Sequence, residues 1–400
     1  MSILGMPRKI QKEIDKIRAG FLWHNGSRKR YHLLRWDSVC RSKQEGGLGI
    51  LNMKQINLAL LSKWAWRFRD PNCLGWWKDI LLDKYARIRS KAKWSQLWKY
   101  INDLEQILKI NRMNIVGNGR SVLFWEDTWI DDKPLKIDYS SLYNICSNTK
   151  CTVAEALSSN FAVIQFNRQL SHVQRDMLCH LQQKLCTVHL TLAPDQVCWV
   201  GGTNGKFSTK NVYRWLDFGG IKINWYQQIW DLTIPLKIKI FLVMLSRNRI
   251  LTKVNLRKRG WEGSTSCEIC GAQETLQHLF FSCYPQYKLW QWGLAKFDYN
   301  CQINSLSDLG HMIVHIDIAE RTPFKIICAA VLWNCWLHRN DLCFRNGTVK
   351  SMRQQGLAIL STLHYWNGMW SDKVRAVMKE LMPVLEELPL QLTLDDTTMP

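Results

Sequence analysis

The sequence predicts a mainly helical (α+β) chain that contains two small β-hairpins. The first observation is the period of its apolar residues, which recur every three or four positions along most of the chain, as on one face of a helix. The second is a pair of glycine–asparagine turns, at 116–119 and 201–205, each beside short apolar runs typical of strands. The third is a hydrophobic content of 46% in 400 residues, which is enough to bury the cores of two or three domains.

The elements of the first half are bounded by proline and glycine. Pro7 suits the first turn of a helix, and Pro71 ends a later one. The helical period then gives way to the turn Gly117-Asn118-Gly119, followed by a short return strand. We expect helices at 1–23, 52–68 and 76–108, a hairpin near 116–125, and short helical pieces over 130–195.

The second half shows clearer start signals. A second hairpin is expected over 197–207, and Ser208 and Thr252 are typical helix N-caps. Pro235 begins another helix, and Pro383 is expected to end or kink the last one. We expect these helices at 208–216, 235–245, 252–259, 284–294, 305–318, 323–339 and 354–381. Most of the 21 tryptophans recur in patterns typical of core anchors.

Four Cys and His residues lie within 17 positions of the second half, spaced Cys267-x2-Cys270-x7-His278-x4-Cys283. A Cys-x-x-Cys turn places two thiolates on one side of an ion. Zn²⁺ in structural sites takes four sulfur and nitrogen ligands at tetrahedral positions. Gly271 permits the left-handed turn that sends the chain around such an ion. The spacing therefore predicts a closed structural Zn²⁺ site with no open position for catalysis.

His278 and Cys283 are five positions apart, or about 140° on an uninterrupted helix, so the helix must stop between them. We expect Pro285 to provide this break by moving Tyr284 out of helical geometry. Two other interpretations of the cysteines stay open. Free cysteines are commonly small buried hydrophobic residues, and 14 cysteines make one Cys-x-x-Cys pair unsurprising. A disulfide would require an oxidising compartment, which the scattered cysteines outside the motif do not support.

The net charge of +21 is concentrated in two short segments. Residues 1–69 hold 15 Lys and Arg against 4 Asp and Glu, and residues 220–260 hold 9 against 1. Such a concentration is typical of a surface that binds phosphate groups, and a solvated basic face is the alternative. The candidate nucleic-acid contacts are Arg28, Lys29, Arg30, Lys237, Lys239, Arg247, Arg249, Arg257, Lys258 and Arg259.

The longest apolar runs, 238–245 and 326–337, fall short of the ~20 residues that a membrane span needs. The first residues are too short and too soon charged for a secretory signal. We therefore expect an intracellular protein, in the nucleus or cytoplasm, with no membrane partner and no small-molecule substrate.

Several ordered stretches resemble a known family. Between Trp199 and Trp290 the chain is similar to the reverse transcriptase zinc-binding domain, which follows the polymerase in plant non-LTR (LINE-type) retrotransposon polyproteins. The resemblance rests on Gly205-Lys-Phe207-Ser208, Ile234-Pro235-Leu-Lys237-Ile-Lys239, Leu251-Thr252 and the Cys267/Cys270/His278-Leu-Phe-Phe-Ser-Cys283 set. Outside this stretch, Gly46-Gly47-Leu48-Gly49 and Phe124-Trp125-Glu-Asp127-Thr-Trp129 resemble other parts of the same polyproteins.

With this resemblance the chain divides into four predicted segments. They are a basic helical segment resembling a polymerase thumb and connector (1–72), a tryptophan-rich linker domain with the hairpin near 116–125 (73–195), the reverse transcriptase zinc-binding domain (196–295) and a C-terminal helical region (296–400). A helical connector and a small zinc-stabilised Cys-Cys-His-Cys module thus complete the predicted fold class.

The resemblance implies a structural zinc ion and binding of RNA or DNA, with the polymerase portion of the parent polyprotein as a further partner. Reverse transcription needs paired carboxylates on a palm strand and a distant third one to hold two metal ions. The pair Asp131-Asp132 lies in an expected loop without that context. We therefore expect a non-catalytic fragment without polymerase or RNase H carboxylates. The alternatives are a folded remnant or protein-interaction module, and an RNA-directed DNA polymerase by family.

Overall fold

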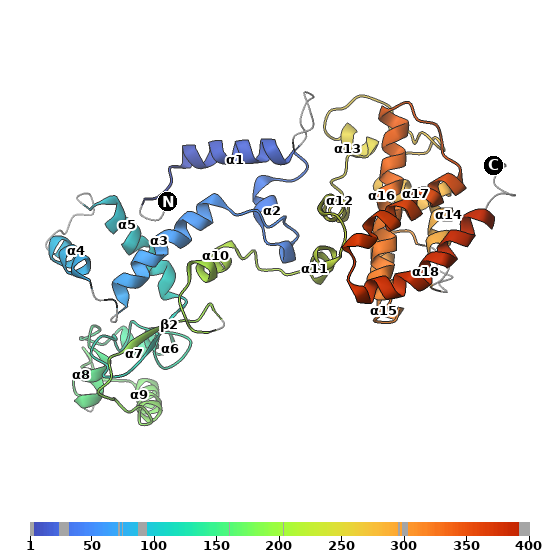
Figure 1. The fold of residues 1–400 in the computed structure, drawn as a ribbon. Coiled ribbons are helices and arrows are strands. Elements are labelled where there is room, and N and C mark those ends of the chain that lie inside the picture. The colour runs from blue at the N-terminus through green and yellow to red at the C-terminus, as the bar shows by residue number, and fades with distance from the viewer. Residues whose placement is uncertain are drawn as a thin grey trace. The chain divides into compact units, whose positions relative to one another are not determined.

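The computed structural model describes residues 4–23, 32–70, 73, 75–86, 94–159, 161–202, 204–294, 297 and 303–391. The chain forms two compact units. The first contains Met1–Ile17 and Leu51–Phe218, and the second contains Arg18–Ile50 and Gly219–Pro400. Each unit is mostly helical, as Figure 1 shows, which confirms the predicted class. The four predicted segments stay a prediction.

The first unit consists of short and medium helices and one small sheet. Helix α1 (Arg8–Leu22) begins in it. The further elements are α3 (Met53–Arg69), α4 (Trp76–Ala86), α5 (Gln96–Lys109), β1 (Arg112–Ile115), α6 (Leu135–Asp138), α7 (Ser140–Tyr143), α8 (Val153–Ser158), α9 (His172–Leu185), β2 (Gln196–Trp199) and α10 (Thr209–Asp217). The side chains of Asn52 and Ser208 accept hydrogen bonds from the first turns of α3 and α10, so the predicted cap at Ser208 is confirmed.

The predicted pairing within two separate hairpins is wrong, because β1 from the first region pairs with β2 from the second. They form an antiparallel sheet in which Arg112 lies opposite Trp199 and Ile115 opposite Gln196. The turn after Ile115 does not lead into a return strand. Instead the Asp195 carboxylate accepts the N–H groups of Gly117, Gly119 and Ser121, at 2.8–2.9 Å. A buried carboxylate with three such donors holds this loop more firmly than two exposed strands could.

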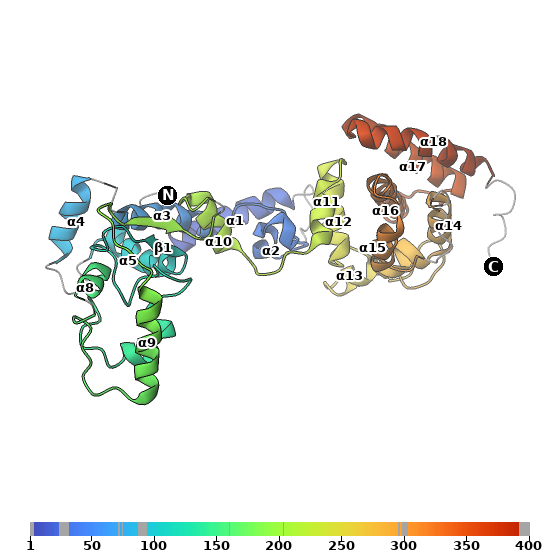
Figure 2. The same cartoon turned by 90° about the horizontal axis from the view of Figure 1, so that it is seen from below.

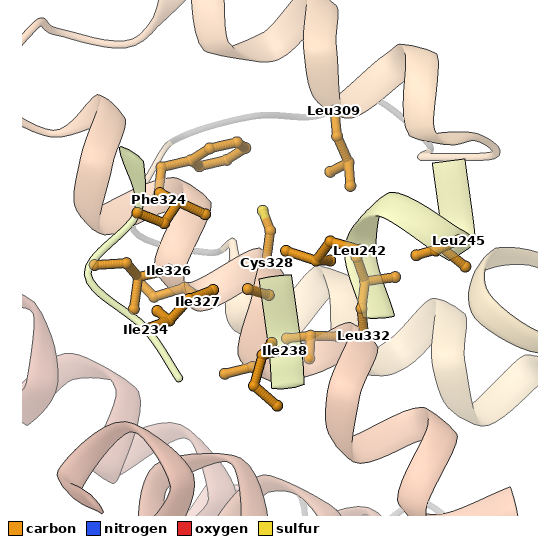
Figure 3. Close-up of a cluster of buried hydrophobic side chains, with 14 of the residues drawn as sticks. Ile234, Ile238, Leu242, Leu245, Leu309, Phe324, Ile326, Ile327, Cys328 and Leu332 are labelled. Atoms are coloured by element: carbon orange, nitrogen blue, oxygen red, sulfur yellow. The ribbon is translucent and has the colours of Figure 1, made fainter. Parts of the chain in front are cut away.

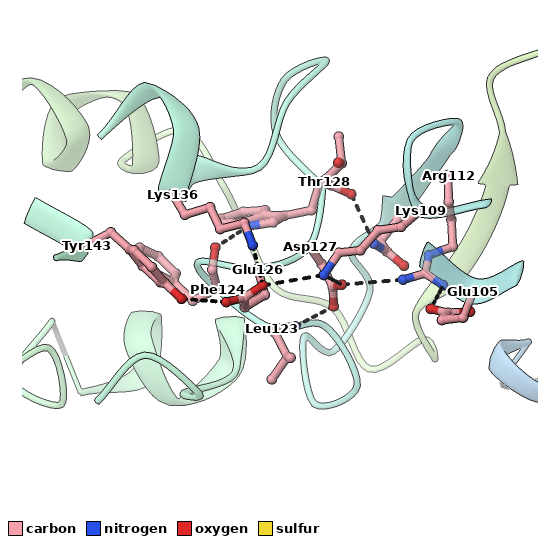
Figure 4. A network of polar contacts seen from close by, with 12 residues as sticks. Glu105, Lys109, Arg112, Leu123, Phe124, Glu126, Asp127, Thr128, Lys136 and Tyr143 are labelled. Carbon is pink, nitrogen blue, oxygen red and sulfur yellow. Dashed lines mark hydrogen bonds and ion pairs between the residues drawn. The ribbon is translucent and has the colours of Figure 1, made fainter. Parts of the chain in front are cut away.

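Two cores fill the first unit. One gathers aromatic side chains of α3, α5 and β2, and the other lies between residues 122 and 185 around Phe124 and Trp125. A polar network borders the second core (Figure 4). Arg112 donates to Glu105 at 2.6 Å and to Asp127 at 3.5 Å. Beside it, the Glu126 carboxylate accepts bonds from the Lys136 ammonium at 2.7 Å and the Tyr143 hydroxyl at 2.5 Å. These groups are partly or wholly removed from water, so each carboxylate needs its partners.

In the part of the chain that the structure describes, the regular elements of the second unit are all helices, and one isolated β-bridge joins Ser266 to Gln273. Its elements are the end of α1, α2 (Trp36–Cys40), η1 (Lys43–Glu45), α11 (Asn224–Asp231), α12 (Leu236–Ser246), α13 (Lys253–Arg257), η3 (His278–Ser282), α14 (Tyr284–Gly293), α15 (Leu306–His315), α16 (Arg321–Phe344), α17 (Met352–Trp366), η5 (Asn367–Met369) and α18 (Asp372–Gln391). Thr252 caps α13 as expected, since its hydroxyl accepts the Asn255 N–H.

Helix α16 is the central element of this unit. It packs against α12, α14, α17 and α18, and Figure 2 shows α17 and α18 running beside one another. In Figure 3, Ile238 and Leu242 of α12 lie beside Cys328 and Leu332 of α16. All four side chains are buried, so an apolar core joins α12 to α16.

The helical predictions for the C-terminal region need one correction. The single helix expected over 354–381 is two helices, α17 and α18, separated by the short turn η5. Trp370 follows this turn and is only 5% exposed. Burial of the Trp370 ring stabilises the turn, and this gain outweighs the helical hydrogen bonds that a continuous helix would keep. Helix α18 also continues past Pro383 to Gln391. Elsewhere Trp66, Trp98, Trp199, Trp290 and Trp292 are buried as expected, whereas Trp76 is 77% exposed.

None of the helices described in the structure is long and apolar enough to cross a membrane.

Candidate metal centre

The first two ligand candidates lie on a tight turn at the start of the motif. An isolated β-bridge joins Ser266 to Gln273, and the Cys267 N–H donates to the Ala272 carbonyl at 2.7 Å. Between them the chain turns at Gly271, whose φ of 74° lies in the left-handed region, as the sequence predicts. The Ile269 N–H points to the Cys267 Sγ at 3.5 Å. The turn thus presents both sulfurs on one side and solvates one of them with backbone N–H groups.

The other two candidates lie at the two ends of η3, a single π-helical turn. The Cys283 N–H donates to the His278 carbonyl at 2.9 Å, which is the i→i+5 bond of that turn. This wider turn brings positions five apart onto the same side. The predicted role of Pro285 is wrong. The helix breaks at Cys283, where ψ is 134°, and Pro285 belongs to the first turn of α14, where its missing N–H is no loss.

The four side chains converge on one point. The Sγ atoms of Cys267, Cys270 and Cys283 and the imidazole of His278 all lie within 4.8 Å of one another. Cys270 Sγ lies 3.2 Å from His278 Nε2 and 3.9 Å from Cys283 Sγ. Tetrahedral ligands around Zn²⁺ would be ~3.8 Å apart for two sulfurs and ~3.6 Å apart for sulfur and nitrogen. The donor set and its spacing therefore fit Zn²⁺ without rearrangement of the backbone.

The charge state of the sulfurs also suits a cation. Hydrogen bonds from the Cys283 thiol and from the backbone N–H groups of Ile269 and Cys270 lower the pKa of the Cys267 thiol, although burial opposes the charge. The same thiol–thiol hydrogen bond and burial raise the pKa of Cys283 well above its usual range. The thiolate is the form that binds metal. The lowered pKa of Cys267 therefore favours the metal-binding form of this side chain.

A buried ion pair lies behind the cluster and links it to α16. Arg339 donates two hydrogen bonds to Glu274 Oε1, at 2.7 and 3.0 Å, and the two side chains are 5% and 1% exposed. Glu274 also accepts the Lys253 N–H at 2.8 Å, and the Lys253 ammonium contacts Glu268 and the Ser266 carbonyl. Sequence reasoning missed this network. Its members are up to 86 residues apart, so no local spacing reveals them.

The predicted nucleic-acid contacts separate into three groups. Lys237, Arg249, Arg257 and Lys258 are exposed, and the Lys237 ammonium lies 5.7 Å from the centre of the Trp333 ring. Lys239, Arg247 and Arg259 are half-buried and each donates to a backbone carbonyl, of Trp230, Glu45 and His32 respectively. Arg28, Lys29 and Arg30 lie outside the described residues.

The four converging side chains make this part of the second unit a candidate zinc site. Residues 207–290 match the family model described as zinc-binding in reverse transcriptase, which confirms the predicted resemblance over this stretch.

Two plant proteins are similar to this chain, one over most of its length and one over about a third of it. A protein of Arabidopsis thaliana named "Putative ribonuclease H protein" is 26% identical over 374 residues, which cover 87% of this chain and 58% of that protein. An "Uncharacterized mitochondrial protein" of the same plant is 27% identical over 145 residues, 34% of this chain and 93% of the relative. The chain thus spans little more than half the length of the first relative.

Proposed function

We propose that this chain is a non-catalytic, retrotransposon-derived protein with one structural Zn²⁺ and a basic module that binds RNA or DNA. Cys267, Cys270 and Cys283 would hold the ion through Sγ and His278 through Nε2. The convergence of these four atoms within 4.8 Å carries the proposal. Because all four ligands come from the protein, the ion would cross-link the fold and leave no position for a substrate.

Metal content tests the zinc site. The purified chain should contain about one zinc ion by elemental mass spectrometry, and Cys283→Ser should lose it together with binding free energy on the order of 10 kcal/mol. Cys186→Ser is the matched control, because Cys186 is an exposed thiol outside the cluster. Equal zinc content in all three proteins, or none in the unaltered chain, would contradict the site.

The nucleic-acid role rests on the exposed cations that precede the Cys267–Cys283 motif in the chain. Arg257 and Lys258 end α13 and are exposed, with no acidic partner among the described residues. Arg249 is exposed shortly before them. Contacts of this kind release counterions, so affinity should fall steeply as salt rises. Charge reversal of Arg257 and Lys258 should weaken RNA or DNA binding measured by fluorescence anisotropy, whereas a folded remnant would show no salt-dependent binding before or after the change.

The absence of catalysis is part of the proposal and has its own test. Asp131 forms an ion pair with Lys184 of α9, so this carboxylate of the Asp131-Asp132 pair is already neutralised by a neighbouring lysine. The chain with Mg²⁺ should neither extend a primer nor cleave an RNA–DNA hybrid. Activity of either kind would favour the enzyme alternative. A further expected partner is the polymerase portion of the parent polyprotein, testable by co-purification.

A further inference from the structure

The two basic segments of the sequence meet within the second unit. Residues 41–49 pack against α11 and the end of α12, where the Ile223 N–H donates to the Gln44 carbonyl at 3.0 Å. Arg247 donates to the Glu45 carbonyl at 3.1 Å, and its guanidinium lies 5.4 Å from the centre of the Tyr226 ring. Cations that are about 200 residues apart in sequence are therefore neighbours in the folded unit.

Two lysines converge on Trp230 at this junction. The Lys43 ammonium lies 4.7 Å from the centre of the Trp230 ring, and the Lys239 ammonium donates to the Trp230 carbonyl at 2.8 Å. Lys43 is exposed, whereas Lys239 is half-buried. The pKa of Lys239 is lowered, first by burial and then by the charge of Lys43. The two ammonium groups thus lie at the same tryptophan, one on its ring and one on its carbonyl, and an anion bound there would offset their repulsion.

The neighbouring carboxylates do not neutralise this pair. Glu45 is buried and accepts bonds from the Gly219 N–H and from the N–H and hydroxyl of Ser42. Asp231 acts on Lys239 through space, and its carboxylate accepts a bond from Gln227. Among the described residues, neither lysine has a carboxylate within ion-pair distance.

We propose that Lys43 and Lys239 together bind one phosphate group of a nucleic-acid backbone. Lys43 is not among the nucleic-acid contacts expected from the sequence, and its place at Trp230 adds it to Lys239. Lys239 uses one of its three N–H donors for the Trp230 carbonyl, and the Lys43 ammonium lies over the Trp230 ring, so both keep donors for a phosphate oxygen. The Arg247 bond to the Glu45 carbonyl joins η1 to the residue that follows α12. The inference rests on the proposed nucleic-acid binding and adds to it which phosphate-binding atoms act together.

The salt dependence of binding tests the shared phosphate. The probe is a single-stranded DNA oligonucleotide, titrated at several salt concentrations against the full zinc-loaded chain. Each phosphate neutralised on a single strand contributes about −0.7 to the slope of log K against log salt. Lys43→Gln, Lys239→Gln and the double variant should therefore each make the slope less negative by about the same 0.7, and the double variant should bind about fivefold more weakly at 0.1 M salt. Two separate phosphate contacts would instead make the slope less negative by about 1.4 in the double variant.

Controls separate this inference from the proposed function. Lys373→Gln removes an exposed lysine of α18, outside both basic segments, and should leave the slope unchanged. Lys43→Arg keeps the charge and should keep the slope. Thermal unfolding of each variant checks that the fold is retained. If the unaltered chain binds with salt dependence but the double variant matches Lys373→Gln, the shared site is wrong and the nucleic-acid role stands. If the unaltered chain does not bind, both are wrong.

Discussion

The buried pair Glu274–Arg339 allows a sharp prediction about what holds residues 267–283 to α16. Arg339→Met keeps most of the aliphatic bulk of the side chain but removes both hydrogen bonds to the Glu274 carboxylate, at 2.7 and 3.0 Å. Of the donors in the described part of the chain, the Lys253 N–H then remains to this carboxylate, which is 1% exposed. Removal of one member of a buried pair typically costs about 3–5 kcal/mol, because the other charge stays buried without its partner. We expect a loss of about 3–4 kcal/mol.

The measurement must report the second unit alone. Hydrogen exchange of peptides from α16, followed by mass spectrometry, gives the free energy of opening for that helix. The double variant Glu274→Gln/Arg339→Met removes the stranded charge and should recover at least about 1 kcal/mol relative to Arg339→Met. Arg345→Met is the matched control, because Arg345 is 79% exposed in its ion pair with Asp341 and should matter by less than about 0.5 kcal/mol. An Arg339→Met loss below 1 kcal/mol, or no recovery in the double variant, would refute the reasoning.

Three further substitutions test local contacts, two in the second unit and one in the first. In the second unit, Gly47→Ala would place a Cβ atom 2.0 Å from the Arg41 carbonyl oxygen and should destabilise the unit by about 3 kcal/mol. Gly310→Ala in α15 meets open space and should stabilise it by about 0.5–1 kcal/mol; equal effects in urea unfolding would contradict the packing. In the first unit, bonds from Lys136 and Tyr143 lower the pKa of Glu126 from 4.5 to about 2. The ionised carboxylate therefore stabilises the fold above pH 4.5, and this contribution is lost as pH falls toward 2. Glu126→Gln should cost about 2 kcal/mol at pH 7, since the group is partly exposed, and nothing near pH 2. A constant difference across that range would exclude the ion pair as the cause.

Local signals in the sequence predicted the parts of the fold that local chemistry decides. The caps at Ser208 and Thr252 and the left-handed turn at Gly271 each depend on residues within a few positions. The Cys/His spacing likewise predicts the four side chains that converge in the fold. Such features follow from the backbone geometry that one residue type permits, so they need no knowledge of the remaining chain.

The remaining features depend on partners that are distant in sequence. Arg112 lies opposite Trp199 across the sheet, Glu274 pairs with Arg339, and Lys43 reaches the Trp230 ring because the core brings η1 to α11. No short spacing encodes such pairs, because many registers and partners are compatible with the same local pattern. The π-helical turn η3 could not be predicted from the apolar period either, because that period assumes hydrogen bonds between residues four apart throughout the helix.

The pairing of β1 with β2 gives the first unit a modular construction. The last matched pair joins Ile115 to Gln196, so residues 116–195 leave and return at one point and carry a core of their own. The Asp195 carboxylate joins the two ends of this segment by accepting the N–H groups of Gly117 and Gly119. A two-residue turn could join the strands directly and keep their register, with loss of the contacts that Lys109, Arg112 and Asn114 make to residues 126–128. The segment is therefore a cassette that can be exchanged, labelled or deleted by protein engineering while the remaining helices keep their own core.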